Sequence, residues 1–236
     1  MRASILIATC LVSSSALAFT CTKGALFAGN PTSSSGADRP ADGTKLLEGP
    51  PFPYRTVAFS KGQLITHSGQ EVWRAALADG KLHKVAGTEG SMQLVAGPCA
   101  KAKFANLAHL VVASDGSLFL SDQAANAILK ITDPLGDKCT VVRWAGAARD
   151  ITDGISPSRR PNAGNVDGPG DKAKLGTPQR LAIDAKDNVY FTEEDNAGIR
   201  RVANDEAHTV STWAPTVAES GRQLSPTFMN GKVYVW

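Results

Sequence analysis

Residues 97–104 read GPCAKAKF, and residues 168–175 read GPGDKAKL, 71 positions further along the chain. The similarity continues without a gap, because FANLAHLVVASDGSLFLSDQAANAILKI (residues 104–131) aligns with LGTPQRLAIDAKDNVYFTEEDNAGIRRV (residues 175–202). Few residues are identical, but apolar positions fall on apolar positions throughout. Self-similarity at a fixed spacing is typical of a repeat architecture, in which each repeat forms one supersecondary unit.

Each repeat has the pattern of a four-stranded antiparallel meander. Two short apolar runs flank Asp115-Gly116 in the first repeat and Asp187-Asn188 in the second, and two further runs follow each pair. An Asp-Gly pair between apolar runs favours a tight hairpin, because the central residues of a type I′ turn need positive φ. Runs of this length are too short for helices. We therefore expect Leu110–Ala113 and Leu181–Asp184 to be the innermost strands of adjacent blades.

The strands are apolar at successive positions, which indicates sheets that are covered on both faces. A radial stack of such sheets is a β-propeller. A weaker copy of the repeat begins at Pro53, and a further copy begins at Pro226 and runs to Trp236. The sequence thus predicts an all-β propeller over residues 53–236, with about three blades and the start of a fourth.

The second strong repeat resembles the NHL repeat. Its glycine, small residues, proline, apolar strand, acidic residue and closing N-x-x-I-R-R-V are similar to the pattern of that family. The resemblance covers about Pro53 to Trp236 and is weakest in the first copy, where Ser68 stands in place of the acidic Asp122. It implies a six-bladed propeller built from four-stranded antiparallel blades.

Three blades and half a hairpin would leave apolar blade faces uncovered. We therefore expect that residues 19–236 alone do not form a closed, stable monomer. Either two copies close one ring as a homodimer, or further blades follow Trp236.

The amino-terminal residues have the features of a secretory signal peptide. Residues 1–18 combine a positive start, an apolar run too short to span a bilayer, and an A-x-A cleavage site. Residues 19–52 are rich in Ser, Gly, Pro and Asp, which is typical of a flexible linker. These features predict a secreted, periplasmic or otherwise extracytoplasmic protein without a transmembrane segment. The alternative is a lipid anchor at Cys21.

Export would place Cys21, Cys99 and Cys139 in an oxidising compartment. Cys99 precedes the first strand of its blade, and Cys139 precedes the fourth strand. In a meander those two strand starts lie at opposite edges of the sheet, whereas a disulfide needs Cα atoms within about 7 Å. We therefore expect Cys99 and Cys139 not to be bonded.

The candidate ligand site is a set of cationic residues. Arg55, His109 and Arg180 occupy one equivalent position, just before each inner strand, so blade geometry would place them around the same channel rim. There they could bind a small ligand that carries a carboxylate or a phosphate. The alternative is that they are ordinary solvated side chains. The net charge of +3 is small and scattered, which gives no support for nucleic-acid binding.

No catalytic constellation is apparent. Asp122 and Glu193 are candidate acids, but both take the acidic position of the NHL pattern, where a carboxylate typically caps a backbone turn. Among the visible inner strands only Asp184 is acidic. The sequence has no Ser/His/Asp set, phosphate loop, HExxH motif or metal-ligand spacing, so we expect no catalytic residue, metal or cofactor.

Three further features have simple structural interpretations. Strand alternation should send one of Arg200 and Arg201 outward to water. Trp144 and Trp213 align in the outer strand and should pack between blades. The insertion at residues 147–166 is absent from the other repeats and is expected to be a surface loop.

These observations predict an exported propeller that acts as a scaffold for a protein or a small anionic ligand. The alternative is a propeller enzyme, a lyase or a lactonase, since related six-bladed folds include such enzymes. Its catalytic residues would then lie largely in blades beyond Trp236.

Overall fold

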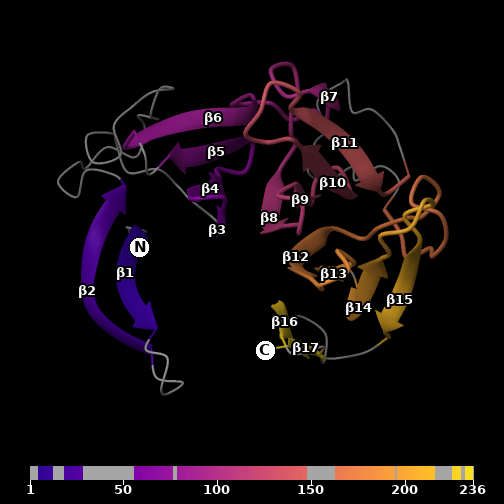
Figure 1. Cartoon of the computed structure of the whole chain (residues 1–236). Helices are drawn as coiled ribbons and strands as arrows, with labels where there is room; N and C mark the ends of the chain where they lie inside the picture. Colours follow the sequence, from indigo (N-terminus) through magenta and orange to yellow (C-terminus); the bar gives the residue numbers. More distant parts are fainter. Residues whose placement is uncertain are drawn as a thin grey trace. The chain divides into compact units, whose positions relative to one another are not determined.

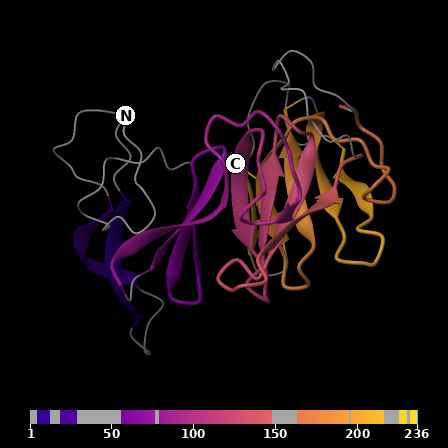
Figure 2. The same ribbon diagram turned by 90° about the horizontal axis from the view of Figure 1, so that it is seen from above.

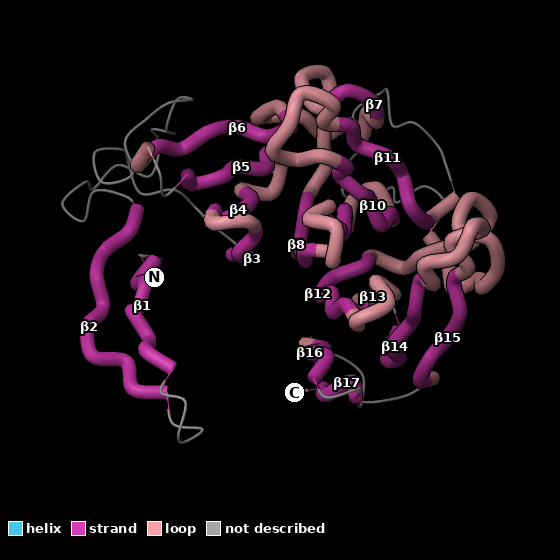
Figure 3. Tube along the Cα trace, viewed as in Figure 1, coloured by secondary structure: helices cyan, strands magenta, loops and turns pink. Residues whose placement is uncertain are grey.

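The computed structural model describes residues 5–12, 19–28, 56–76, 79–147, 163–194, 196–215, 225–229 and 232–235. All of these residues lie in strands, turns or loops, and no helix occurs among them (Figure 3). The described part of the chain is therefore all-β, as predicted. It also contains no helix long and apolar enough to cross a membrane.

The chain divides into two compact units, which are described separately. The first comprises Met1–Tyr54 and Ala75–His83, and the second comprises Arg55–Arg74 and Lys84–Trp236. In the first unit, β1 (Ile5–Val12) and β2 (Phe19–Ala28) pair as an antiparallel two-stranded sheet. The predicted signal peptide contains β1, and the predicted linker begins with β2. Cleavage after Ala18 stays a prediction.

Four-stranded antiparallel meanders follow one another along the rest of the chain (Figure 1). The first blade contains β3 (Val57–Ser60), β4 (Gln63–His67), β5 (Glu71–Ala76) and β6 (Lys81–Gly87). The second contains β8 (Leu107–Val112), β9 (Leu118–Asp122), β10 (Ala127–Thr132) and β11 (Thr140–Ala145), with the short β7 (Gly97–Pro98) outside β11. The third contains β12 (Pro178–Ile183), β13 (Val189–Glu193), β14 (Asn196–Val202) and β15 (Val210–Ala214). Last, β16 (Pro226–Met229) and β17 (Lys232–Val235) form a two-stranded antiparallel sheet.

The predicted inner strands are confirmed as edge strands of two separate sheets. β8 and β12 each begin three residues before the predicted starts. Their hairpins differ in detail from the expected two-residue turn, because Ala113 N–H bonds to the Ser117 carbonyl across a three-residue loop. In that loop only the last residue needs the left-handed conformation. Gly116 adopts it with φ +89°, and the equivalent Asp187 with φ +61°.

The central strands of the blades are covered on both faces, as their continuous apolar sequences predict. Every residue of β9 and of β13 is buried. One core lies between the first and second blades and includes Ile65, Val72, Leu94, Phe104, Leu110, Leu120 and Leu129. Another lies between the second and third and includes Phe119, Ile128, Leu175, Leu181, Val189, Phe191 and Val202. Each large side chain buried in this way stabilises the stack by about 1.5–3 kcal/mol.

Hydrogen bonds also join the inner hairpins of consecutive blades. Lys61 Nζ in the first hairpin donates to the Asp115 carbonyl in the second at 3.2 Å. Ser114 in the second hairpin donates to the Asp187 carboxylate of the third through its backbone N–H (2.9 Å) and its hydroxyl (2.6 Å). The second and third blades accordingly stand next to each other in both views (Figures 1 and 2). This contact repeats from blade to blade, as expected for a propeller.

Residues 97–104, and the similar residues 168–175, link the outer edge of a blade to its inner strand. Gly97 and Pro98 pair with Val141 and Thr140 of β11, the outermost strand of the meander. In the third blade, Gly168 bridges in the same way to Val210 of β15. Each of these segments leads into the inner strand, but it starts beside the outer strand.

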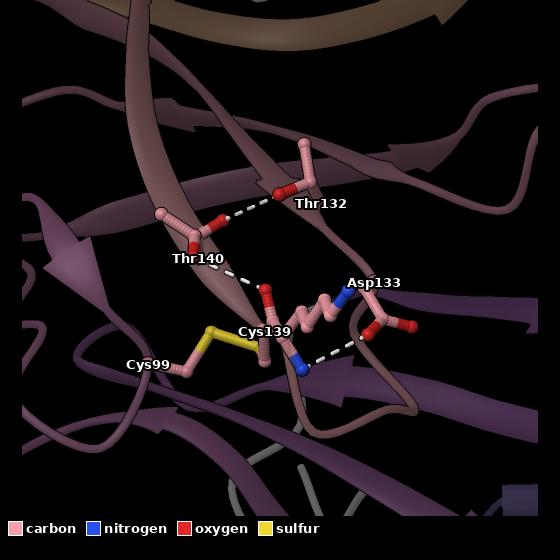
Figure 4. Close-up of a disulfide and its surroundings, with 6 residues drawn as sticks. Cys99, Thr132, Asp133, Cys139 and Thr140 are labelled. Atoms are coloured by element: carbon pink, nitrogen blue, oxygen red, sulfur yellow. Dashed lines mark hydrogen bonds between the residues drawn. A yellow bond between two sulfur atoms is a disulfide. The ribbon is translucent and has the colours of Figure 1, made fainter.

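Cys99 and Cys139 form a disulfide, so the prediction that they are not bonded was wrong (Figure 4). Their Cα atoms are 5.4 Å apart, and Cys99 N–H donates to the Cys139 carbonyl at 3.0 Å. The prediction placed Cys99 at the inner edge because it precedes β8. The pairing of β7 with β11 instead brings it to the outer edge, next to Cys139.

Candidate functional site

The inner strands of the second and third blades carry the same irregularity at their starts. The register of β8 against β9 shifts between Leu107 and His109, and that of β12 against β13 shifts between Pro178 and Leu181. Such bulges re-aim side chains and are frequent beside functional sites. Here they fall at His109 and Arg180, two of the residues selected from the sequence.

A hydroxyl group fills the gap in each ladder. His109 N–H donates to Ser121 Oγ at 3.1 Å, and Arg180 N–H donates to Thr192 Oγ1 at 3.3 Å. Ser121 Oγ in turn donates to the Gln179 carbonyl at 2.6 Å and so joins the two blades. The two repeats therefore contain the same hydrogen-bonded arrangement, which fixes the backbone at both His109 and Arg180.

The structure brings His109 and Arg180 together. His109 Nδ1 accepts a hydrogen bond from Leu181 N–H at 3.4 Å, so the imidazole of the second blade lies against the inner strand of the third. Burial and, to a lesser extent, the nearby charge of Arg180 together lower the pKa of His109 to about 4. The imidazole is therefore neutral at pH 7. Because Nδ1 is an acceptor, Nε2 carries the proton and is a hydrogen-bond donor.

Arg180 provides the positive charge of this site. Its side chain is half-buried, and its guanidinium has no carboxylate partner among the described residues. Arg200 is the contrasting case: its guanidinium is fully buried and binds Glu193 at 3.1 Å and Asp167 at 2.9 Å. The charge of Arg180 thus has no carboxylate counter-ion among the described residues, whereas that of Arg200 is compensated by two.

Two glutamines that the sequence comparison did not select lie at the same edge. Gln179 Nε2 donates to Gln123 Oε1 at 2.8 Å, across the boundary between the second and third blades. Gln123 aligns with Glu194 in the other repeat, and Gln179 aligns with Ala108. Since neither glutamine has an equivalent, a comparison of repeats has no signal that could find them.

The third residue of the predicted cationic arc, Arg55, lies outside the described residues, and so does most of the insertion at residues 147–166. The candidate site of the described structure therefore consists of His109 and Arg180, with Gln123 and Gln179 beside them.

The two candidate acids have structural roles, as their place in the repeat suggested. Asp122 is fully buried and accepts bonds from the N–H groups of Ala105 (2.8 Å), Asn106 (3.0 Å) and Ala125 (3.1 Å). Burial raises the pKa of Asp122, and these three donors act in the opposite direction. The equivalent Glu193 accepts from Gly176 N–H at 2.7 Å. Both carboxylates cap the segment that leads into the inner strand.

Arg200 and Arg201 differ in burial, in the direction that strand alternation predicts, although neither is fully exposed to water. Arg200 is completely buried, and Arg201 is half-buried. Arg200 also donates to the carbonyls of Lys174 (2.8 Å) and Val166 (2.9 Å). It therefore ties the link before β12 to the blade. Strand alternation alone does not reveal this contact, because the link covers the face of β14 on which Arg200 lies.

A cavity lies beside the outer strand of the second blade. Trp144 packs edge-on against Phe119 and stacks on His208 with ring centroids 3.5 Å apart, which confirms its role in packing. The cavity, of about 280 Å³, lies beside Trp144 and is lined also by Gly170. Trp213 contacts Tyr190 but is 45% exposed, so it is a weaker packing element.

The described residues contain no group of three or more His, Cys, Asp or Glu side chains that could hold a metal ion. Asp184, the acid of the visible inner strands, is engaged within its own hairpin. Its carboxylate accepts from Lys186 N–H and Asn188 N–H at 2.9 Å each, from the Asn188 amide at 2.8 Å, and from Tyr190 Oη at 3.2 Å.

The described chain is therefore an all-β protein with the blade architecture of a β-propeller. No protein-family model matches it, and no curated protein matches it. Among solved structures it is similar to an auxiliary nutrient binding protein from Bacteroides ovatus (17% identity, 70% of this chain and 38% of that one, TM-score 0.48). A protein of the same description from Bacteroides thetaiotaomicron gives 15% identity over 64% and 32% of the two chains, with a TM-score of 0.45.

A catalytically inactive virginiamycin B lyase from Staphylococcus aureus, solved with quinupristin, is also similar (13% identity, 68% of this chain and 41% of that one, TM-score 0.42). The chain thus spans about a third to two fifths of the length of these proteins. Binding proteins and an enzyme both occur among them. The assignment of the fold rests on the blades themselves.

Proposed function

We propose that this chain is an exported, NHL-type β-propeller that binds a small anionic ligand at the inner edge of its second and third blades. The observation that carries the proposal is the half-buried guanidinium of Arg180, which has no carboxylate partner among the described residues and lies beside the neutral imidazole of His109. An arginine in this state binds a carboxylate or phosphate through paired, charge-assisted hydrogen bonds.

His109 adds a donor without adding a second charge. A protonated imidazole next to Arg180 would be repelled, which is part of the reason for its low pKa. In its neutral form the Nε2–H group can donate to the oxygen of a ligand held by Arg180.

The export proposal draws on two observations. The A-x-A signal at residues 16–18 is typical of secretion. The disulfide between Cys99 and Cys139 is of the kind that forms and persists in oxidising compartments. The N-x-x-I-R-R-V phrase and the acidic cap at Asp122 and Glu193 support assignment to the NHL type.

The hydrogen bonds that the acidic side chains already make favour binding over a lyase or lactonase activity. In the described part of the chain, Asp122 and Glu193 bind backbone N–H groups, and Asp184 accepts bonds from its own hairpin. Carboxylates held in this way are poorly placed for proton transfer to a substrate.

The test is an NMR titration of the full chain with acetate and with inorganic phosphate. Arg180→Gln should weaken binding of these anions by about tenfold or more, since a charge-assisted bond contributes about 1.5–3 kcal/mol. Lys172→Gln removes the same charge from an exposed position, where Lys172 pairs with the equally exposed Asp171, and should bind like the wild type. Absence of binding to the wild type, or an Arg180→Gln variant that binds equally well, contradicts the proposal.

A further inference from the structure

The inner-edge site combines one positive charge with several neutral hydrogen-bonding groups. Arg180 offers the donors of its guanidinium, and His109 offers Nε2–H. In the Gln123–Gln179 pair, one bond is made between Gln179 Nε2 and Gln123 Oε1. That bond leaves the amide N–H₂ of Gln123 and the carbonyl oxygen of Gln179 available to a ligand.

The balance of charge selects among anions. Among the residues that the structure describes, Arg180 is the one charged side chain placed at this site, because His109 is neutral at pH 7. A monoanionic carboxylate is compensated by this charge. A dianionic phosphate would bring a second negative charge into a half-buried site without a partner, which is unfavourable because the ion must give up its hydration.

The glutamine pair adds a second element of recognition. The two amides fix each other's orientation, and Ser121 Oγ fixes the Gln179 backbone through its 2.6 Å bond. Gln179 and Arg180 both fall in the register shift between Pro178 and Leu181, where two residues of β12 stand opposite one residue of β13, so Gln179 of the pair belongs to the same bulge as Arg180. One free donor and one free acceptor match hydroxyl groups, since each hydroxyl can both donate and accept.

We propose that the ligand is a hydroxylated carboxylic acid of the sugar-acid type. Its carboxylate binds Arg180 and the Nε2–H of His109, and its hydroxyl groups bind the Gln123–Gln179 pair. This inference rests on the proposed function and goes further, because it separates a monoanionic, hydroxylated ligand from anions in general.

The experiment compares D-glucuronate, acetate, D-glucose and glucose 6-phosphate as probes for the full chain at pH 7.5, by NMR titration. D-Glucuronate should bind about tenfold more tightly than acetate, because two added neutral hydrogen bonds contribute about 0.5–1.5 kcal/mol each. D-Glucose should bind at least tenfold more weakly than D-glucuronate, and glucose 6-phosphate should also be weaker than D-glucuronate.

Variants divide the site into its two parts. Gln123→Ala removes one of the two proposed hydroxyl contacts, so it should narrow the difference in affinity between D-glucuronate and acetate. Gln123→Glu has the same shape but a negative charge, so it should weaken both acids. Arg180→Gln should weaken both acids as well, and thermal unfolding of each variant establishes that it is folded.

The outcomes separate the inference from the proposed function. Equal affinities for acetate and D-glucuronate, or tighter binding of glucose 6-phosphate, overturn the sugar-acid inference but leave anion binding intact. Tighter binding of an acetylated dipeptide with a free carboxylate also overturns it, in favour of a peptide carboxyl terminus. Failure of every anion to bind overturns the proposed function itself.

Discussion

Removal of the Cys99–Cys139 disulfide tests how the outer edge of the second blade is held. The two cysteines are 40 residues apart in the sequence, and the bond closes β8, β9 and β10 within one covalent loop. For a loop of about 40 residues, the loss of chain entropy in the unfolded state corresponds to about 4 kcal/mol. The backbone bond from Cys99 N–H to the Cys139 carbonyl does not need the sulfurs. The double variant Cys99→Ala/Cys139→Ala should therefore fold but lose about 2–4 kcal/mol of stability.

Urea unfolding followed by tryptophan fluorescence measures this loss. The midpoint should fall in the double variant, and the wild type in reducing buffer should fall by a similar amount. Reductant should have no effect on the double variant, which makes it the matched control. A change below about 0.5 kcal/mol, the range of a neutral surface substitution, would refute the argument, as would peptide mapping that recovers no 99–139 cross-link.

Three further predictions concern single residues. Asp122→Asn should cost about 1–3 kcal/mol in urea unfolding, because its amide would face one of the three N–H donors now bound by the carboxylate; a stability equal to that of a control substitution at the exposed Asp137, Asp137→Asn, would contradict this. In the unfolded chain His109 takes up a proton below its ordinary pKa of 6.5, whereas in the folded protein it does so only near pH 4. The free energy of unfolding should therefore fall by about 1–3 kcal/mol as the pH drops from 6.5 to 4. If the His109→Gln variant keeps the same pH profile of stability, the assignment is wrong. Gly170→Ala should lower the melting temperature, because a Cβ would lie 2.7 Å from the Trp144 carbonyl oxygen; an unchanged melting temperature would show that the backbone relaxes there.

The fold could be predicted from the sequence because the short patterns that specify its strands and turns are repeated along the chain. Apolar runs, turn residues and the acidic cap recur at a spacing of 71 residues, and each implies a local structure that the neighbouring copy supports. His109 and Arg180 were selected as candidates for the same reason, since blade symmetry places equivalent residues at equivalent positions.

The features that escaped prediction depend on where the irregular segments run. Cys99 meets Cys139 because the link starts along β11, and a link has no periodicity that reveals its path. Arg200 is buried because the link before β12 covers it, and its guanidinium donates to the Val166 carbonyl of that link. The Gln123–Gln179 contact joins two positions that do not align, so it emerges only when the blades are packed together.

A crystal structure of the full chain with D-glucuronate tests the inner-edge site most directly. The proposed site predicts the carboxylate in the fork of Arg180 with N···O distances of about 2.7–2.9 Å, His109 Nε2 within hydrogen-bond distance, and a sugar hydroxyl on Gln123. A ligand bound elsewhere, or an Arg180 guanidinium paired with an acidic side chain of the chain itself, would contradict it.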